Sequence, residues 1–274
     1  MQTSQTAVEA IALASSATKE SSRGPVARRW GLYIGVVIAA LIVWHLISLL
    51  TIPLFLPGPI LVGEAVVRQI EKGTLQSDVR ITFFRVLSGW ILGAMIAIPV
   101  GLAAGRLPLF RGVTQPFTNF FRFIPPIALI TLAVIWLGIG DPARISIIAY
   151  SSLFIVFLST LHGASSVDEV KLRAARSLGA SGRHQMITVI VPASLPSIIT
   201  GMRAGMGNAF MTAVAAELIG ADSGVGYMII NAGVVGRTDI AIAGLFALGA
   251  MGFVADYGFR LITSRITFRF GIVF

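Results

Sequence analysis

A polar stretch between two long hydrophobic segments has the sequence Arg173-Ala174-Ala175-Arg176-Ser177-Leu178-Gly179. After a gap of nine residues come two apolar residues and a proline, Val189, Val191 and Pro192. The side chains of Ala174 and Ala175 are small enough for a groove of another protein to close around them, and Gly179 permits a tight turn. Because the flanking segments are suited only to lipid, this stretch is predicted to emerge from a membrane and to meet a partner in water.

The composition fixes the broad class of protein. The chain has 274 residues, of which 55% are hydrophobic and 12% charged, and its mean hydropathy is +0.87. Too few polar side chains are present to cover a water-soluble globule, so an integral membrane protein is predicted. The chain has no cysteine, which excludes a disulfide framework and thiolate catalysis. Its net charge of +9 is spread between hydrophobic blocks, which favours a topology signal over nucleic-acid binding.

The hydrophobic blocks predict an all-α membrane protein with about six transmembrane helices. Each block approaches the roughly 20 apolar residues that cross a hydrocarbon core, and none alternates as the strands of a membrane barrel do. The third block is the shortest. The six blocks are Leu32–Ile52, Val86–Gly105, Ile124–Gly138, Ala143–His162, Leu195–Gly220 and Ile240–Ile262.

The distribution of Lys and Arg predicts the orientation. With a cytoplasmic N-terminus, the inner loops carry many more basic residues than the outer ones, where acidic residues balance several of them. Both termini and the loop between the fourth and fifth blocks are therefore expected in the cytoplasm. The predicted domains are a flexible cytoplasmic tail over 1–30, a transmembrane domain over 31–264 with the loop at about 164–192, and a cytoplasmic tail over 265–274.

The loop itself is predicted to form two short helices. Ser166 and Glu169 have the spacing of a capping box at a helix N-terminus, and Gly179 is a typical C-terminal stop. Apolar residues recur at helical spacing at Val167, Val170, Ala174 and Leu178. A second helix is expected over about Arg183 to Val191, ending at Pro192.

The loop resembles the cytoplasmic coupling loop of ABC-transporter permeases, in which an Ala-Ala pair, a glycine four residues later and an apolar-x-apolar-Pro ending form the surface that docks on an ATPase. By this resemblance the docking residues are Arg173, Ala174, Ala175, Leu178, Gly179 and Pro192. The chain departs from the family at Arg173, where a glutamate is usual. The resemblance extends over roughly Leu54 to Phe259, in Leu56-Pro57-Gly58-Pro59, Ile124-Pro125-Pro126, Trp136–Gly140 and Glu217–Ala221 with Gly224–Tyr227, and it indicates the nitrate, taurine and alkanesulfonate branch.

The resemblance implies a type I ABC importer permease fold and an assembly of several chains. The implied partners are two copies of an ABC ATPase subunit, a periplasmic substrate-binding protein and a second copy of this chain, all at a bacterial inner membrane. ATP and Mg would bind to the ATPase, and this chain would hold no cofactor. It would form the translocation pathway for a small anion of the sulfonate, taurine or nitrate class; an aromatic carboxylate or a vitamin precursor is an alternative cargo.

The residues also argue against an enzyme. No Gly-Lys dipeptide occurs, so the chain has no P-loop to hold a nucleotide, and no catalytic residues are predicted. His45, His162 and His184 have no partner at the spacing of a metal site or a catalytic triad. An ion-driven secondary transporter or channel is a weaker alternative, because no paired broken helices or buried carboxylate pair is visible. A membrane scaffold without transport activity is a third.

Two further patterns lie within the hydrophobic blocks. Small residues recur every fourth position at Gly89, Gly93, Ala97, Gly101 and Gly105, which predicts close approach of a neighbouring helix that is either static or able to slide. The fifth block carries three costly polar groups, Arg203, Asn208 and Glu217. Arg203 and Glu217 are close enough to the block's ends for their side chains to extend to an interface. The functional hypothesis is that all three contribute to the translocation pathway, with Arg203 supplying positive potential at the cytoplasmic exit and Asn208 lining the pathway deeper in.

Overall fold

The computed structural model describes residues 26–218 and 220–269, and all regular elements in these ranges are helices. The elements are α2 (Val26–Leu49), α3 (Pro59–Glu71), α4 (Thr74–Arg106), α5 (Pro108–Phe121), the 3₁₀ turn η1 (Pro126–Leu129), α6 (Ile130–Leu137), α7 (Asp141–Ser165), α8 (Glu169–Ser177), α9 (Gly182–Gln185), the π-helical turn η2 (Met186–Ile190), α10 (Val191–Glu217), α11 (Val225–Val234) and α12 (Thr238–Arg269). The all-α prediction is confirmed.

The chain divides into two units, Met1–Leu61 and Val62–Phe274. The first unit holds α2, whose stretch Gly31–Leu49 is long and apolar enough to cross a membrane. Large hydrophobic side chains such as Leu32 and Ile42 are exposed within this unit, as expected for a helix that lies in lipid. Residues 1–25 and 270–274 of the two predicted tails lie outside the described residues.

The second unit contains four long apolar helices, α4, α7, α10 and α12, and one broken pair. Helices α5 and α6 pass the same test of length and hydropathy only together, and they are bent by 91° at the break between them. The prediction of a single helix over Ile124–Gly138 is therefore wrong, although the bent pair as a whole can count as the sixth predicted span. Proline disfavours helical geometry at the residue before it and removes a donor, so Pro125 and Pro126 interrupt the helix, and the eight-residue α6 is too short to cross a ~30 Å core.

The small residues of α4 lie against α7, as the four-residue repeat predicts. A Cβ atom added at Gly89 would come within 2.7 Å of Ile148 Cβ, one at Gly93 within 2.6 Å of Ala149 O, and one at Gly101 within 2.8 Å of Thr160 Cβ. These separations are shorter than any normal contact, so the two helices are as close as their backbones allow.

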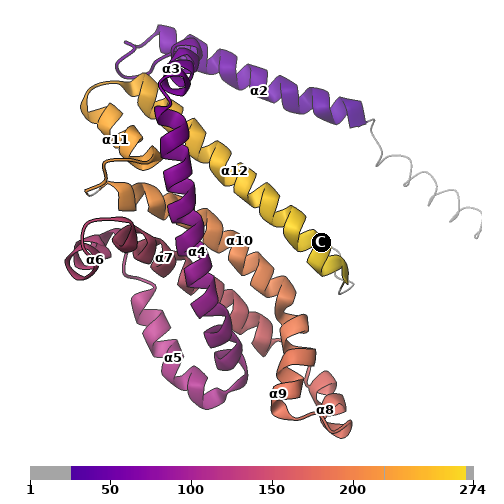
Figure 1. Cartoon of the computed structure of the whole chain (residues 1–274). Coiled ribbons are helices and arrows are strands. Elements are labelled where there is room, and N and C mark those ends of the chain that lie inside the picture. The colour runs from indigo at the N-terminus through magenta and orange to yellow at the C-terminus, as the bar shows by residue number, and fades with distance from the viewer. Residues whose placement is uncertain (1–25, 219, 270–274) are drawn as a thin grey trace, which may run out of the picture. The chain divides into compact units, whose positions relative to one another are not determined.

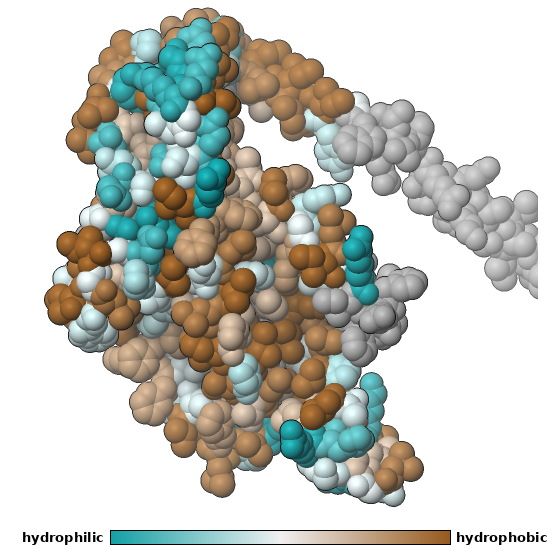
Figure 2. Space-filling view, viewed as in Figure 1, coloured by the Kyte–Doolittle hydropathy of each residue, from teal (hydrophilic) through white to brown (hydrophobic). Residues whose placement is uncertain are grey.

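The core of the second unit lies between α4, α7, α10, α11 and α12. Its fully buried members include Val86, Ile148, Ala209, Ala213 and Val225. Figure 1 shows α8 and α9 together at the N-terminal end of α10, whereas α11 follows its C-terminal end. Over this unit, the face seen in Figure 2 is mainly hydrophobic between hydrophilic groups at its two ends, as expected for a bundle that crosses a membrane.

Candidate functional site: the loop between α7 and α10 and the polar groups of the bundle

Helix α8 begins at a side-chain cap different from the predicted one. The carboxylate of Asp168 accepts a hydrogen bond from the backbone N–H of Val170 at 2.8 Å. Ser166, the residue expected to cap the helix, still has helical geometry at the end of α7, and its hydroxyl donates to the carbonyl of Gly163 at 3.0 Å. The predicted capping box is therefore wrong, because α7 extends three residues beyond the predicted end of its span at His162.

Helix α8 ends at Ser177, and Gly179 stops it, as predicted. Gly179 has φ of 82°, in the left-handed region that favours glycine. Its N–H donates to the carbonyl of Arg176 at 2.9 Å, and the N–H of Ala180 donates to the carbonyl of Ala175 at 3.0 Å. This pair of bonds is a Schellman motif, which reverses the chain immediately after the Ala-Ala pair.

The apolar residues of the loop divide into a buried anchor and an exposed set. Leu172 is 0% exposed and packs in a small core with Ala164, Val167 and Ile190. By contrast, Val170 is 60% exposed and Leu178 is 88% exposed. Of the apolar residues predicted to recur along the helix, Val170, Ala174 and Leu178 are therefore exposed within this chain. Leu172, which is not in that pattern, is the residue of α8 that is fully buried. An apolar tip held rigidly in water is typical of a protein–protein contact.

The segment after Gly179 does not form a helix that stops at Pro192. Helix α9 passes into η2, and η2 passes into α10 without an interruption, so that Gly182–Glu217 is one continuous helical run. The prediction that Pro192 ends the second helix is wrong. Pro192 lies in the first turn of α10, where a missing N–H is tolerated, directly after a π-type bond from the N–H of Val191 to the carbonyl of Met186.

An ion pair and an open groove complete the loop. The carboxylate of Glu169 lies 3.5 Å from Arg106 at the end of α4 and 3.8 Å from Arg176. Between α8 and α9 is a groove of ≈ 590 Å³, lined by Ala175, Leu178, Gly179, Ala180, Ser181, His184, Thr188 and Val189. Arg173 and Ala174 are exposed at the same loop. Three of the six predicted docking residues, Ala175, Leu178 and Gly179, therefore line this groove, whereas Pro192 lies in α10.

Arg203 and Asn208 make contacts between helices. The Arg203 guanidinium binds the carboxylate of Asp256 on α12 at 2.8 and 3.2 Å, and Arg260 lies 2.6 Å from the same carboxylate. Asn208 donates from Nδ2 to the carbonyl of Ser151 on α7 at 3.0 Å. The sequence analysis missed Asp256, although its spacing of four residues from Arg260 is a signal of an ion pair on a helix.

Glu217 does not extend to an interface; it is 1% exposed. Its carboxylate accepts hydrogen bonds from Arg85 Nη1, Thr82 Oγ1 and the N–H of Gly226, each at 2.8 Å. Gly224 lies against the same carboxylate, since an added Cβ would come within 2.5 Å of it. Glycine is therefore required at Gly224 and Gly226, because the Glu217 carboxylate occupies the space that a side chain at these positions would need.

Arg85 is the hub of this buried cluster, and sequence reasoning missed it. Its Nε binds Asp141 Oδ1 at 2.7 Å and its Nη1 also donates to the carbonyl of Ser223 at 2.8 Å. We expected the second span to begin at Val86, but α4 begins at Thr74. The helical recurrence of Leu75, Val79, Thr82 and Val86 in the sequence was the signal that would have placed Arg85 inside a helix.

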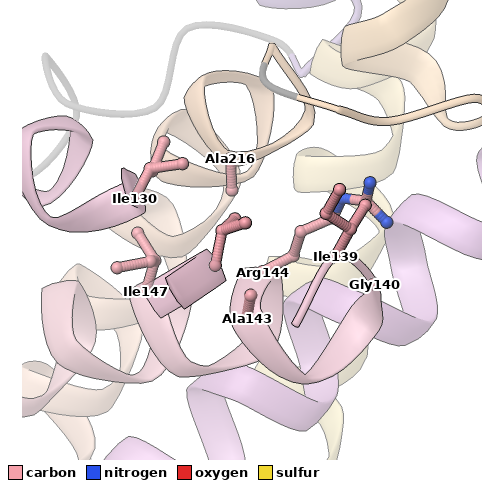
Figure 3. A pocket seen from close by; sticks show the side chains of 8 residues that line it. Ile130, Ile139, Gly140, Ala143, Arg144, Ile147 and Ala216 are labelled. Carbon is pink, nitrogen blue, oxygen red and sulfur yellow. The ribbon is translucent and has the colours of Figure 1, made fainter. Parts of the chain in front are cut away.

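Arg144 is buried beside this cluster. It lines a small cavity of ≈ 10 Å³, room for about one water molecule, whose other walls are mainly apolar (Figure 3). Its guanidinium points away from Ile130 and Ile147 and donates to the carbonyl of Gly220. Arg85 and Arg144, which the positive-charge count placed in loops expected on the outer side, are thus buried in helices.

Comparison with known proteins identifies the family. Residues 97–268 match the binding-protein-dependent transport system inner membrane component family. The chain is 36% identical over 252 residues to the taurine transport system permease protein TauC of Escherichia coli K12, which covers 89% of this chain and 92% of that protein. It is 30% identical over 246 residues to the putative aliphatic sulfonates transport permease protein SsuC of Bacillus subtilis 168, with 88% and 89% covered.

A solved structure shares the fold. An inward-facing structure of the MetNI methionine ABC transporter matches with a TM-score of 0.58 at 19% identity, over 71% of this chain and 98% of that one. The chain therefore belongs to the family of binding-protein-dependent transport system inner membrane components, and it is a multi-pass membrane permease with a type I ABC importer fold.

Proposed function

We propose that this permease forms the translocation pathway of an ATP-driven importer for a small anion with a sulfonate or carboxylate group. The observation that carries the proposal is the exposed apolar tip at Leu178, which is fixed by the fully buried Leu172 and a Schellman turn at Gly179. A tip of this kind suits docking on a second protein. The similarity to TauC and to SsuC supports taurine or an alkanesulfonate as the cargo class.

The proposed assembly has two copies of the permease, two ATPase subunits that bind ATP and Mg, and a binding protein at the outer face. Residues Arg173, Ala174, Ala175, Leu178 and Gly179 would contact the ATPase from the cytoplasmic side, with Pro192 supporting them from α10. Arg173 replaces the usual glutamate, so the facing ATPase surface is expected to offer an acidic or neutral group at this point. Both termini are proposed to lie in the cytoplasm.

Within the bundle, Arg203 and Asn208 are proposed to border the pathway. Arg203 and Arg260 share the single carboxylate of Asp256, so the three groups together keep a net positive charge. Because the Arg203 donors are already bonded to Asp256, an anion is attracted by this charge but not held by direct bonds to Arg203, and its release is hindered less. Glu217 is left out of the proposed pathway, because its carboxylate is buried in the cluster around Arg85.

Co-purification tests the proposal. The tagged permease is expected to retain its candidate ATPase, and ATP hydrolysis in lipid should rise when loaded binding protein is added. Leu178→Asp should abolish the complex without unfolding the permease, because Leu178 makes no core contact. Uptake that is driven by an ion gradient in the absence of ATP would instead support the secondary-transporter alternative.

A further inference from the structure

A second open space lies between α7 and α10, separate from the groove of the coupling loop. This pocket has a volume of ≈ 430 Å³ and is lined by Leu158, Ser159, His162, Pro196, Ser197 and Thr200. Four of these six residues are polar. His162 lies in the last turn of α7 and Ser197 in the second turn of α10, so the pocket is at the end of the bundle that carries α8.

The two serine hydroxyls in this pocket differ from other hydroxyls on the same helices, including that of Thr200 in the pocket, which donates to the carbonyl of Pro196 at 2.9 Å. The hydroxyls of Thr160 and Ser194 donate to carbonyls of their own helix, at 2.7 Å each. Such local bonds are the usual way to satisfy a hydroxyl inside a membrane helix. Within the described part of the chain, Ser159 and Ser197 have no hydrogen-bond partner, and neither does the imidazole of His162. These donors are available to a ligand.

Glycines fix the position of the two serines. Gly163 faces Ser197 so closely that an added Cβ would lie 2.6 Å from the serine Cβ, and Gly201 faces Ser159 in the same way. The two helices therefore cannot approach further, and the hydroxyls stay at a defined separation. Because the donors are already held in place, less conformational entropy is lost when they bind a ligand.

The exposed face of α10 beyond the pocket is also unlike a lipid-facing surface. From Ala204 to Asn208 it carries small and polar residues, up to the exposed Met211, whereas the exposed faces of α4 and α12 carry large apolar residues such as Ile91 and Phe253. Small and polar residues along a transmembrane helix are expected where the helix faces protein or water. The pocket is thus the inner end of a polar track on α10.

We propose that this pocket binds the oxyanion group of the cargo, a sulfonate or a carboxylate, during its exit to the cytoplasm. The proposal rests on the proposed import function and adds the site. Ser159, Ser197 and His162 each supply one O–H or N–H donor to the anion. Neutral or weakly charged donors hold an anion less firmly than a free arginine does, so the cargo can leave. Arg203, whose charge is shared with Asp256, contributes long-range attraction and not the direct contact.

The absence of cysteine provides a direct test. The variants Ser197→Cys and Ser159→Cys each introduce a single cysteine. Each variant, assembled with its ATPase in nanodiscs, is treated with the anionic reagent sulfonatoethyl methanethiosulfonate or with its cationic trimethylammonium analogue. After division by the rates for a free thiol, the anionic reagent should be favoured roughly tenfold, a factor that a few hydrogen bonds to an anion provide. Millimolar taurine should slow the reaction. Ile91→Cys, on an exposed apolar face of α4, is the unreactive control.

Transport gives a second readout. Ser159→Ala with Ser197→Ala should lower ATP-dependent taurine uptake by about tenfold or more, since each lost hydrogen bond costs a factor of about five. Retention of the ATPase on co-purification shows that the double variant still folds and assembles. The control is Ser194→Ala, whose hydroxyl is bonded within α10 and should not affect uptake. The proposed anion site is wrong if the cysteines react with neither reagent or react faster with the cationic one, even when uptake by the wild type is normal. If no complex with the ATPase forms, the proposed import function is refuted. The anion site can then still be tested by labelling the permease alone.

Discussion

The Nη1 atom of Arg85 lies 2.8 Å from Oε1 of Glu217, and the two side chains are 3% and 0% exposed. The pair connects α4 to the end of α10. The same guanidinium reaches Asp141 on α7 and the carbonyl of Ser223 ahead of α11. A single arginine therefore holds three long helices and a connecting segment together at the end of the bundle opposite α8.

Glu217→Gln is expected to destabilise the permease by about 1–3 kcal/mol, because the buried Arg85 guanidinium would keep only the partly exposed Asp141 as an acidic partner. The midpoint of thermal unfolding in detergent measures the change. Glu64→Gln is the control, since Glu64 pairs with Arg68 on the exposed surface of α3 and its loss should cost less than about 1 kcal/mol. Equal midpoints for the two variants would contradict the structural role of the cluster.

Leu172 and Leu178 should separate folding from docking. Leu172→Ala removes a fully buried side chain and is expected to destabilise the loop by about 2–5 kcal/mol. Leu178→Ala should leave the unfolding midpoint unchanged, because the side chain is 88% exposed, but should weaken ATPase binding. Unfolding and co-purification are measured on both variants. A Leu178→Ala permease that binds the ATPase as tightly as the wild type is the contrary outcome.

Gly179→Ala should weaken the ATPase complex through backbone strain. Any side chain at a φ of 82° costs about 1–2 kcal/mol, so the Schellman turn would relax and the exposed tip would lose its fixed direction. Binding to the ATPase is measured by titration. Gly182→Ala, three residues further along, is the matched control: its added Cβ meets nothing within 4 Å, and its φ is not positive. The idea fails if both variants bind alike.

Gly93→Ala should disrupt the contact between α4 and α7. The new methyl group would lie 2.6 Å from the Ala149 carbonyl oxygen, and overpacking of this kind costs about 1–3 kcal/mol. Gly112→Ala in α5 has open space around the new methyl group and is expected to be neutral or slightly stabilising, because alanine favours helix. The thermal unfolding midpoints of both variants show whether the stability depends on the space at Gly93 or only on the loss of a glycine. Equal midpoints would contradict the role of space.

Much of the bundle was predictable from periodicity and length. Five spans were recognised because runs of about 20 apolar residues have few alternatives in lipid. The close approach at Gly89 and Gly93 followed from their spacing. The third span was misjudged because a count of apolar residues does not register the bend that Pro125 and Pro126 introduce.

The polar groups were harder to predict, because their partners are distant in sequence. Arg85 and Glu217 are separated by 132 positions, and no local pattern joins them. The exposure of Leu178 was equally hidden, since apolar residues at helical spacing suggest burial until Leu172 is seen to occupy the core. The stop at Gly179, in contrast, depends only on local backbone geometry, and the sequence was sufficient for it.

The small core beneath α8 joins elements that belong to three long helices. Leu172 packs with Leu102 of α4, Ala164 of α7 and Ile190, the last residue of η2 before α10. Because α4 and α7 are also in close contact through glycines, we expect a movement of α8 to shift α4, α7 and the start of α10 together. Distances between labels on α4 and α7 should then remain constant through the ATP cycle, while those from α4 to α12 change.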